Sequence, residues 1–138
     1  MEDHTKMENK TALISGGARG IGRCIVRRFL ERGYHVYILD IDEEELKHTV
    51  TVHLKQYHDD KKLDYAVCNL RSVDEIRDKV KRAAEVLGGR IEVLVNNGGI
   101  AAPNWADGQT MADLDTIKQW QACVQFSYSI LYQSRRQC

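Results

Sequence analysis

The 138-residue sequence has no long apolar run, no excess of charge of either sign and no closely spaced pair of cysteines. No stretch approaches the ~20 apolar residues that cross a bilayer, and the polar N-terminus lacks the apolar core of a signal peptide. Lysines and arginines number 20, as do aspartates and glutamates, which gives no overall attraction to nucleic acid or an acidic membrane. The four cysteines form no C-x-x-C pattern, so we expect reduced thiols in a cytoplasmic protein, with no disulfide framework and no metal site.

The length is that of one domain, and 43% hydrophobic with 29% charged residues is an ordinary globular composition. We expect residues 1–10 to be a polar tail and residues 11–138 to form a single domain. Short apolar runs alternate with segments of helical periodicity, which predicts βαβ units around a parallel sheet. The four runs predicted as strands are residues 11–15, 35–40, 63–68 and 91–95.

Helical patterns fill the intervals between these runs. Ile21, Ile25 and Phe29 recur at i, i+4 and i+8 after the first run, and residues 43–57 carry an apolar face. A capping box at 72–75 opens a third helix. A loop is expected over residues 96–114 and a last helix from residue 115. Right-handed crossovers then predict an α/β fold, a Rossmann-like doubly wound parallel sheet of about four strands with flanking helices.

The turn between the first strand and the first helix is rich in glycine and reads Ser15-Gly16-Gly17-Ala18-Arg19-Gly20-Ile21-Gly22. Glycines allow a sharp turn and a close approach of backbone to a pyrophosphate, while the helix N-terminus offers N–H groups to the phosphates. The Gly-Lys-Ser/Thr of a P-loop is missing, because Arg23-Cys24 follow the last glycine. The alternative is a tight strand-to-helix turn without a ligand.

Asp40 ends the second predicted strand, 20 residues beyond Gly20. An acid there is placed to accept a hydrogen bond from the adenosine ribose 2′-hydroxyl. It repels a 2′-phosphate by about 4 kcal/mol for unit charges ~4 Å apart, so we expect NAD rather than NADP. Arg19 is the opposing signal, because a guanidinium beside the turn can meet a 2′-phosphate. The alternative role for Asp40 is a helix cap, which Asp42 can also supply.

In this order and spacing, the residues resemble the short-chain dehydrogenase/reductase family. The glycine-rich turn is similar to the family's Thr-Gly-x-x-x-Gly-x-Gly with serine for threonine, and Asp40 matches the acid of NAD-preferring members. Asn69 falls where the family places an acid near the adenine, and residues 96–99 resemble its Asn-Asn-Ala-Gly. The cofactor-binding residues that the resemblance implies are Ser15, Gly16, Arg19, Gly20, Ile21, Gly22, Asp40, Asn69, Leu70, Asn96 and Gly98.

The resemblance covers residues 11–135, the first half of a typical member. It implies an NAD(P)-dependent oxidoreductase that acts on a small alcohol or carbonyl compound. In the family a Ser, a Tyr-x-x-x-Lys pair and a helix Asn move the proton while the nicotinamide exchanges hydride. The chain ends before the Ser and the pair, and Ser127 stands at the position of the Asn, so we expect the chain alone to be inactive. The alternatives are a non-catalytic nucleotide-binding module and a non-functional truncated product.

Two further patterns carry expectations of their own. Residues 57–61 spell a Tyr-x-x-x-Lys string at the end of the second crossover helix, where we expect an apolar helix end followed by solvated charges. The histidines His48, His53 and His58 recur every five residues and not at the i, i+4 spacing of helical metal ligands. We expect the fourth strand to be an unprotected sheet edge in this chain, which favours marginal stability or self-association into a homo-oligomer.

Overall fold

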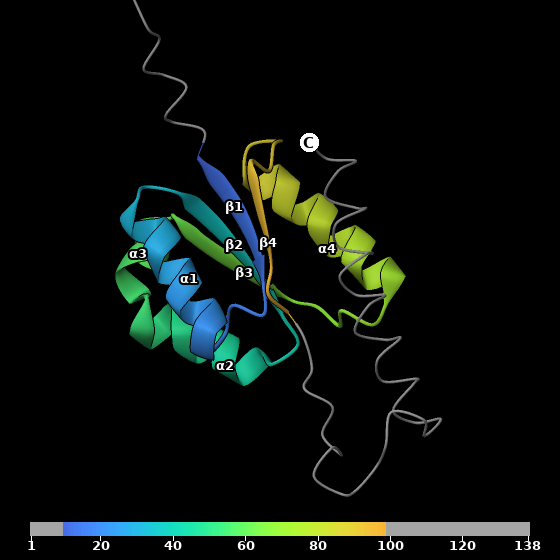
Figure 1. Ribbon diagram of the computed structural model, residues 1–138, viewed down its shortest axis with the longest axis horizontal. Helices are drawn as coiled ribbons and strands as arrows, with labels where there is room; N and C mark the ends of the chain where they lie inside the picture. Colours follow the sequence, from blue (N-terminus) through green and yellow to red (C-terminus); the bar gives the residue numbers. More distant parts are fainter. Residues whose placement is uncertain (1–9, 99–138) are drawn as a thin grey trace, which may run out of the picture.

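The computed structural model describes residues 10–98, which form one parallel sheet covered by helices on both faces (Figure 1). The strands are β1 (Thr11–Ser15), β2 (His35–Asp40), β3 (Leu63–Val67) and β4 (Val93–Asn96). Their order in the sheet is β3-β2-β1-β4, and all three pairings are parallel. This is the order of one half of a doubly wound sheet, so the predicted fold class is confirmed.

The helices divide between the two faces of the sheet. One face carries α1 (Gly20–Glu31), α2 (Glu43–His48), the π-helical segment η2 (Thr49–His53) and α3 (Lys55–Asp59), and the other carries α4 (Val73–Val86) (Figure 1). The single helix expected over residues 43–57 is therefore wrong, because a π-helical turn divides it. Its apolar face is nevertheless buried against the sheet. Among residues 10–98, no helix is long and apolar enough to cross a membrane.

Alternation along the strands supplies both halves of the core. Ala12 and Ile14 of β1 pack with the side chains of α1 and α2, whereas Leu13 between them packs with α4. All three are fully buried. Burial on both faces explains the near-continuous apolar runs, and each fully buried leucine or isoleucine contributes about 1.5–3 kcal/mol.

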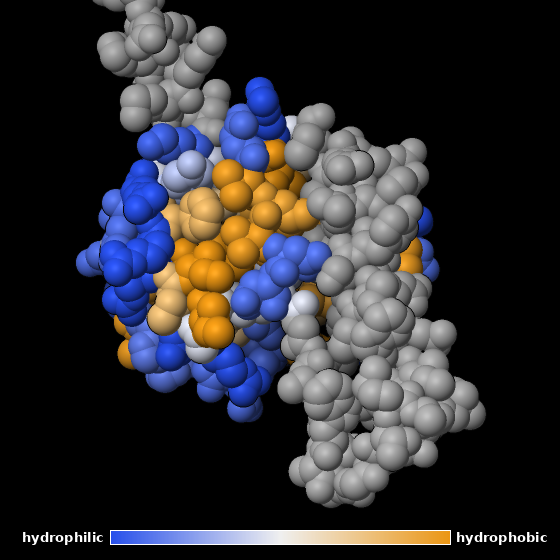
Figure 2. Space-filling model, in the orientation of Figure 1, coloured by the Kyte–Doolittle hydropathy of each residue, from blue (hydrophilic) through white to orange (hydrophobic). Residues whose placement is uncertain are grey.

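Helix α1 buries a different face from the one its apolar row suggested. Its buried residues are Gly22, Val26 and Leu30, while Ile21 is 76% exposed. Ile25 and Phe29, which continue the predicted apolar row from Ile21, are only partly buried. All three residues border a shallow apolar groove on α1. This side of α1 adjoins the apolar patch in the middle of Figure 2. The helix is rotated because its glycine lies against the end of β1, where no larger residue fits.

The predicted bounds of β1 and β2 are confirmed, whereas those of β3 and β4 shift by one or two residues. Strand β3 ends at Val67, and β4 begins at Val93 and ends at Asn96, although Ile91 just before it is buried. Helix α4 begins where the capping box predicted, since the Ser72 hydroxyl accepts a hydrogen bond from the Glu75 N–H. Most of the predicted loop over residues 96–114, the predicted last helix and Ser127 lie outside the described residues, as does most of the predicted N-terminal tail.

Candidate functional site

The predicted site residues gather at one edge of the sheet. Parallel strands end at a common edge, so the glycine-rich turn after β1, Asp40 at the end of β2, Asn69 after β3 and Asn96 at the end of β4 lie along it. The chain leaves β1 toward β2 on one side, while β4 pairs on the other side. In open α/β sheets, ligands bind outside the carboxyl ends of the strands at such a reversal.

The Tyr-x-x-x-Lys string at residues 57–61 lies at the opposite edge. It ends α3 and leads into the beginning of β3, and Tyr57 packs partly against the core. The Tyr57 ring is therefore part of the helix packing, as the interpretation of a helix end requires.

The ends of β1 and β4 are fastened to each other by Ser15. Its hydroxyl accepts a hydrogen bond from the Gly98 N–H at 2.8 Å and donates to Asn96 Oδ1 at 3.5 Å. The Asn97 side-chain amide donates to the Gly16 carbonyl at 3.1 Å. Ser15 is fully buried, so its hydroxyl shapes the rim of the site from beneath.

Two glycines set the distance between the turn and its surroundings. Gly16 has a φ of +69°, and a Cβ there would lie 2.8 Å from the Gly98 Cα. A Cβ on Gly22 would lie 1.9 Å from the Gly16 carbonyl oxygen. Any larger residue at either position would separate β1, β4 and the first turn of α1. The glycines at these positions therefore bring the N-terminus of α1 to the edge of the sheet.

Gly20 differs from both, because it is surrounded by space. Its φ is +57°, and among residues 10–98 a Cβ built there would meet no atom within 4 Å beyond its chain neighbours. The neighbouring Ile21 is 76% exposed. The first turn of α1 thus presents backbone to an open region beside the glycine-rich turn, and a ligand can approach it without a side chain in the way.

The N-terminus of α1 also lacks the side-chain capping found on α2 and α4. Arg19 at its N-cap makes no side-chain cap, and its first turn holds no acidic residue. Asp42 caps α2 and Ser72 caps α4, and acidic residues follow in both first turns. The positive end of the α1 dipole is therefore not neutralised by its own side chains, which is the arrangement that favours a bound anion.

Asp40 holds the backbone of the glycine-rich turn. Its Oδ2 accepts a hydrogen bond from the Ala18 N–H and its Oδ1 from the Asp42 N–H, each at 3.1 Å. The Thr49 hydroxyl donates to the Ala18 carbonyl at 2.6 Å. The alternative role of Asp40 as the cap of the next helix is wrong, because Asp42 accepts the hydrogen bond from the Glu45 N–H.

Sequence reasoning did not identify Thr49 and Ala18 as parts of the site. Both are fully buried. Asp40 binds the Ala18 N–H and Thr49 binds the Ala18 carbonyl, so the backbone of Ala18 is held at both of its polar groups. The available signal was a threonine inside the apolar face of a predicted helix. Its partner could not be recognised, since it lies 31 residues away across the sheet face.

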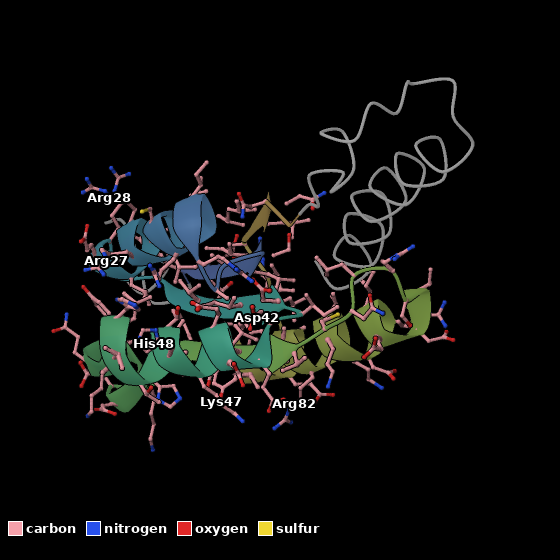
Figure 3. The ribbon with its side chains drawn as sticks, turned by 90° about the horizontal axis from the view of Figure 1, so that it is seen from below. Arg27, Arg28, Asp42, Lys47, His48 and Arg82 are labelled. Carbon is pink, nitrogen blue, oxygen red and sulfur yellow. The ribbon has the colours of Figure 1, made fainter. Side chains whose placement is uncertain are left out.

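Arg19, the residue that argued for NADP, is engaged by an acid. Its Nη2 lies 2.5 Å from Asp42 Oδ2 in an ion pair, with side-chain exposures of 64% and 29%. Asp42 lies between α1 and α2, whereas Lys47 lies on the far side of α2 (Figure 3). Lys47 pairs there with Glu43 at 2.8 Å.

Asn69 and Leu70 form the third part of the edge. The Asn69 Oδ1 accepts a hydrogen bond from the Arg71 N–H at 3.0 Å, which shapes the turn after β3. Leu70 is 8% exposed, and its Cδ1 would lie 2.5 Å from a Cβ built on Gly98. The glycine that replaces the family's alanine thus makes room for Leu70.

Burial raises the pKa of the Cys68 thiol to about 12, so this cysteine is a neutral core residue.

Comparisons with known proteins agree with this geometry. The sequence pattern of the short chain dehydrogenase family matches residues 10–134. The chain is 38% identical over 94 residues to 3beta-hydroxysteroid dehydrogenase 2 of Eggerthella lenta, covering 68% of this chain and 35% of the relative. It is 36% identical over 114 residues to zerumbone synthase of Zingiber zerumbet, covering 83% and 40%.

Solved structures show the same likeness. A short chain dehydrogenase of Burkholderia cenocepacia in complex with NADP matches with a TM-score of 0.77 and 27% identity, over 94% of this chain and 51% of that one. An actinorhodin polyketide ketoreductase with NADPH matches with a TM-score of 0.75 and 26% identity, over 95% and 48%. The chain therefore spans about half of these structures. Since the family pattern extends over nearly the whole sequence, this chain belongs to the short chain dehydrogenase family.

Proposed function

We propose that the chain binds a nicotinamide dinucleotide along the carboxyl edge of its sheet and prefers NAD to NADP. The reaction that we assign to it is the family's hydride transfer between the nicotinamide and a small alcohol or carbonyl compound. The single observation that carries the proposal is the uncapped N-terminus of α1 beside the open Gly20. A pyrophosphate is the anion that this backbone geometry accommodates.

The phosphates would bind at the first turn of α1. The backbone N–H groups of Gly20, Ile21 and Gly22 belong to the helix end that lacks a side-chain cap. The open space at Gly20 lets an oxygen approach the backbone closely. The requirement for glycine at this position is therefore one of ligand access and of a positive φ, and not of internal packing.

The ribose would bind at Asp40. Each of its carboxylate oxygens accepts one backbone hydrogen bond and keeps a second lone pair, so the acid can hold the turn and accept from a ribose hydroxyl together. A 2′-phosphate would approach the charge of Asp40, whereas the charge of Asp42 is balanced by Arg19. At ~4 Å and an effective dielectric of ~20, the contact with Asp40 costs about 4 kcal/mol before screening by solvent. This repulsion supports the preference for NAD.

The adenine and the nicotinamide would lie on either side of this centre. The side-chain Oδ1 of Asn69 has a second acceptor site, which could bind the adenine amino group. Leu70 would form an apolar wall beside the adenine. Asn96 and Gly98, at the end of β4, would line the cleft toward the nicotinamide. A bound nicotinamide supplies or accepts the hydride. Ser127, at the place of the family's helix Asn, lies outside the described residues.

Isothermal titration of the 138-residue chain with NADH and NADPH tests the proposal. We expect saturable binding of NADH and at least tenfold weaker binding of NADPH. Absence of heat with both dinucleotides at about 1 mM would contradict dinucleotide binding. Tighter binding of NADPH would contradict the preference alone, because the phosphate site would then be intact.

A further inference from the structure

We propose that Asp42 is a second determinant of cofactor choice, which acts by holding Arg19 away from the ribose side of the site. The inference rests on the proposed binding of a nicotinamide dinucleotide. It concerns the ion pair that joins the glycine-rich turn to the beginning of α2. Asp42 is thus a positioning residue, whose effect on the ligand passes through the Arg19 guanidinium.

The Asp42 carboxylate is held in place by the backbone around it. Its Oδ1 accepts the capping hydrogen bond from the Glu45 N–H at 3.1 Å, and its own N–H donates to Asp40 Oδ1 at 3.1 Å. With one oxygen used by the cap, the other is directed to Arg19 Nη2 at 2.5 Å. Only 29% of the side chain is exposed, so this acid does not sample the range of conformers of an ordinary surface aspartate.

Arg19, in contrast, is fixed mainly by this one partner. It is the N-cap of α1 with extended backbone, and 64% of its side chain is exposed. A released guanidinium at this place could form a bidentate contact with a phosphate, for which its planar fork is suited. When Arg19 is engaged by Asp42, it offers fewer free N–H donors, and the pair carries no net charge.

Neutralising Asp42 changes the net charge that these three residues present to a 2′-phosphate. Arg19 and Asp42 together contribute zero, so Asp40 leaves the ribose side with a net negative charge that repels a 2′-phosphate. Without the charge on Asp42, Arg19 balances Asp40, and the guanidinium gains an incoming phosphate as its strongest partner. When paired with Asp42, Arg19 therefore no longer attracts the 2′-phosphate of NADP, although an arginine at this place is typical of NADP binding.

The test is Asp42→Asn, in which asparagine keeps the helix cap and loses the charge. NADH and NADPH are titrated against the 138-residue chain by nucleotide fluorescence. We expect NADPH affinity to rise about tenfold relative to NADH, with NADH affinity unchanged within about twofold. Glu44→Gln is the matched control, because it removes one charge from the same exposed turn without a contact to Arg19. We expect its ratio to move less than about twofold.

A double-mutant cycle with Arg19→Ala separates the pair from a general effect of charge. In the Arg19→Ala background, Asp42→Asn should raise the NADPH-to-NADH affinity ratio by at most about threefold, because it then relieves only the screened repulsion from one carboxylate and frees no guanidinium. An equal change with and without Arg19, or no change in the wild-type background, would overturn the proposal. Asp42→Ser, which also caps, replaces Asp42→Asn if that variant does not fold. If wild type and variants bind neither dinucleotide, the proposed function fails and this inference with it, whereas binding of NADH without the shift overturns the inference alone.

Discussion

Replacement of Gly20 by alanine separates the ligand-binding role of the glycine-rich turn from its role in folding. The φ of +57° makes the substitution cost about 1–2 kcal/mol of the free energy of unfolding, because alanine avoids the left-handed region. No steric cost arises from the part of the chain that the structure describes, since none of its other atoms lies within 4 Å of the new Cβ. The melting temperature should fall by about 4 °C for each kcal/mol lost from the free energy of unfolding. Binding of NADH should weaken by about tenfold to a hundredfold, because the methyl group occupies the approach to a charge-assisted hydrogen bond.

Gly33→Ala is the matched control for this change. Gly33 has a φ of +85°, and a Cβ built there also meets nothing within 4 Å among the described residues, but Gly33 follows α1 and lies before β2 at the opposite edge of the sheet. The two variants should therefore lose similar stability by circular dichroism, and only Gly20→Ala should lose affinity in a fluorescence titration. Equal affinities in both variants would refute the assignment of the phosphate site to the first turn of α1.

Three further changes test the surroundings of the site. Thr49→Val leaves the buried Ala18 carbonyl without its donor and should destabilise the chain by about 1–3 kcal/mol in urea unfolding, whereas Thr49→Ser should restore most of the loss. Asp40→Ala removes the acceptor of two backbone N–H groups and should cost a similar amount, while the NADH-to-NADPH affinity ratio falls about tenfold. The Cys68 thiol, with its pKa raised from 9.0 to about 12 by burial, should resist iodoacetamide at pH 9 in peptide-resolved mass spectrometry, and the exposed Cys24 should react; rapid labelling of Cys68 in the folded chain would contradict its burial. Since unfolding restores the lower pKa, the contribution of this thiol to stability is full below pH 9 and is lost as the pH rises toward 12.

The strands and the site edge could be predicted because local patterns and the topology agree. Apolar runs buried on both faces mark β1 and β2, and parallel strands must end at one edge. The positions of Gly20, Asp40 and Asn96 at that edge follow from this arrangement. Side-chain contacts across the edge do not follow, because they depend on distances between segments that are far apart in the chain.

Helix α1 shows why the buried face was harder to predict. The residues Ile21, Ile25 and Phe29 are the more apolar row, but Gly22 has to lie against the Gly16 carbonyl and rotates the helix toward the sheet on its own side. A close backbone contact has overridden the apolar pattern. The π-helical turn at η2 could not be predicted from the apolar pattern either, since no residue in it breaks helical periodicity.

The Arg19 signal illustrates how a motif can mislead without its partner. From the sequence, a guanidinium beside the glycine-rich turn opposes the acid at Asp40. The structure joins Arg19 to Asp42, whose carboxylate also caps α2. The pairing spans 23 residues and could not be deduced from spacing. Arg19 is therefore one half of a charge-neutral pair next to Asp40, and not a free cation that opposes this acid.

Titration of the ¹⁵N-labelled chain with NADH, followed by amide chemical shifts, tests the central claim most directly. The account predicts saturable shifts at the backbone amides of residues 16–22, 40–42 and 96–98, with little change at Gly33 and Gly88, which lie at the far edge of the sheet. NADPH should produce the same pattern at higher concentration. Absence of shifts, or shifts centred on residues 57–61 at the opposite edge, would contradict the account.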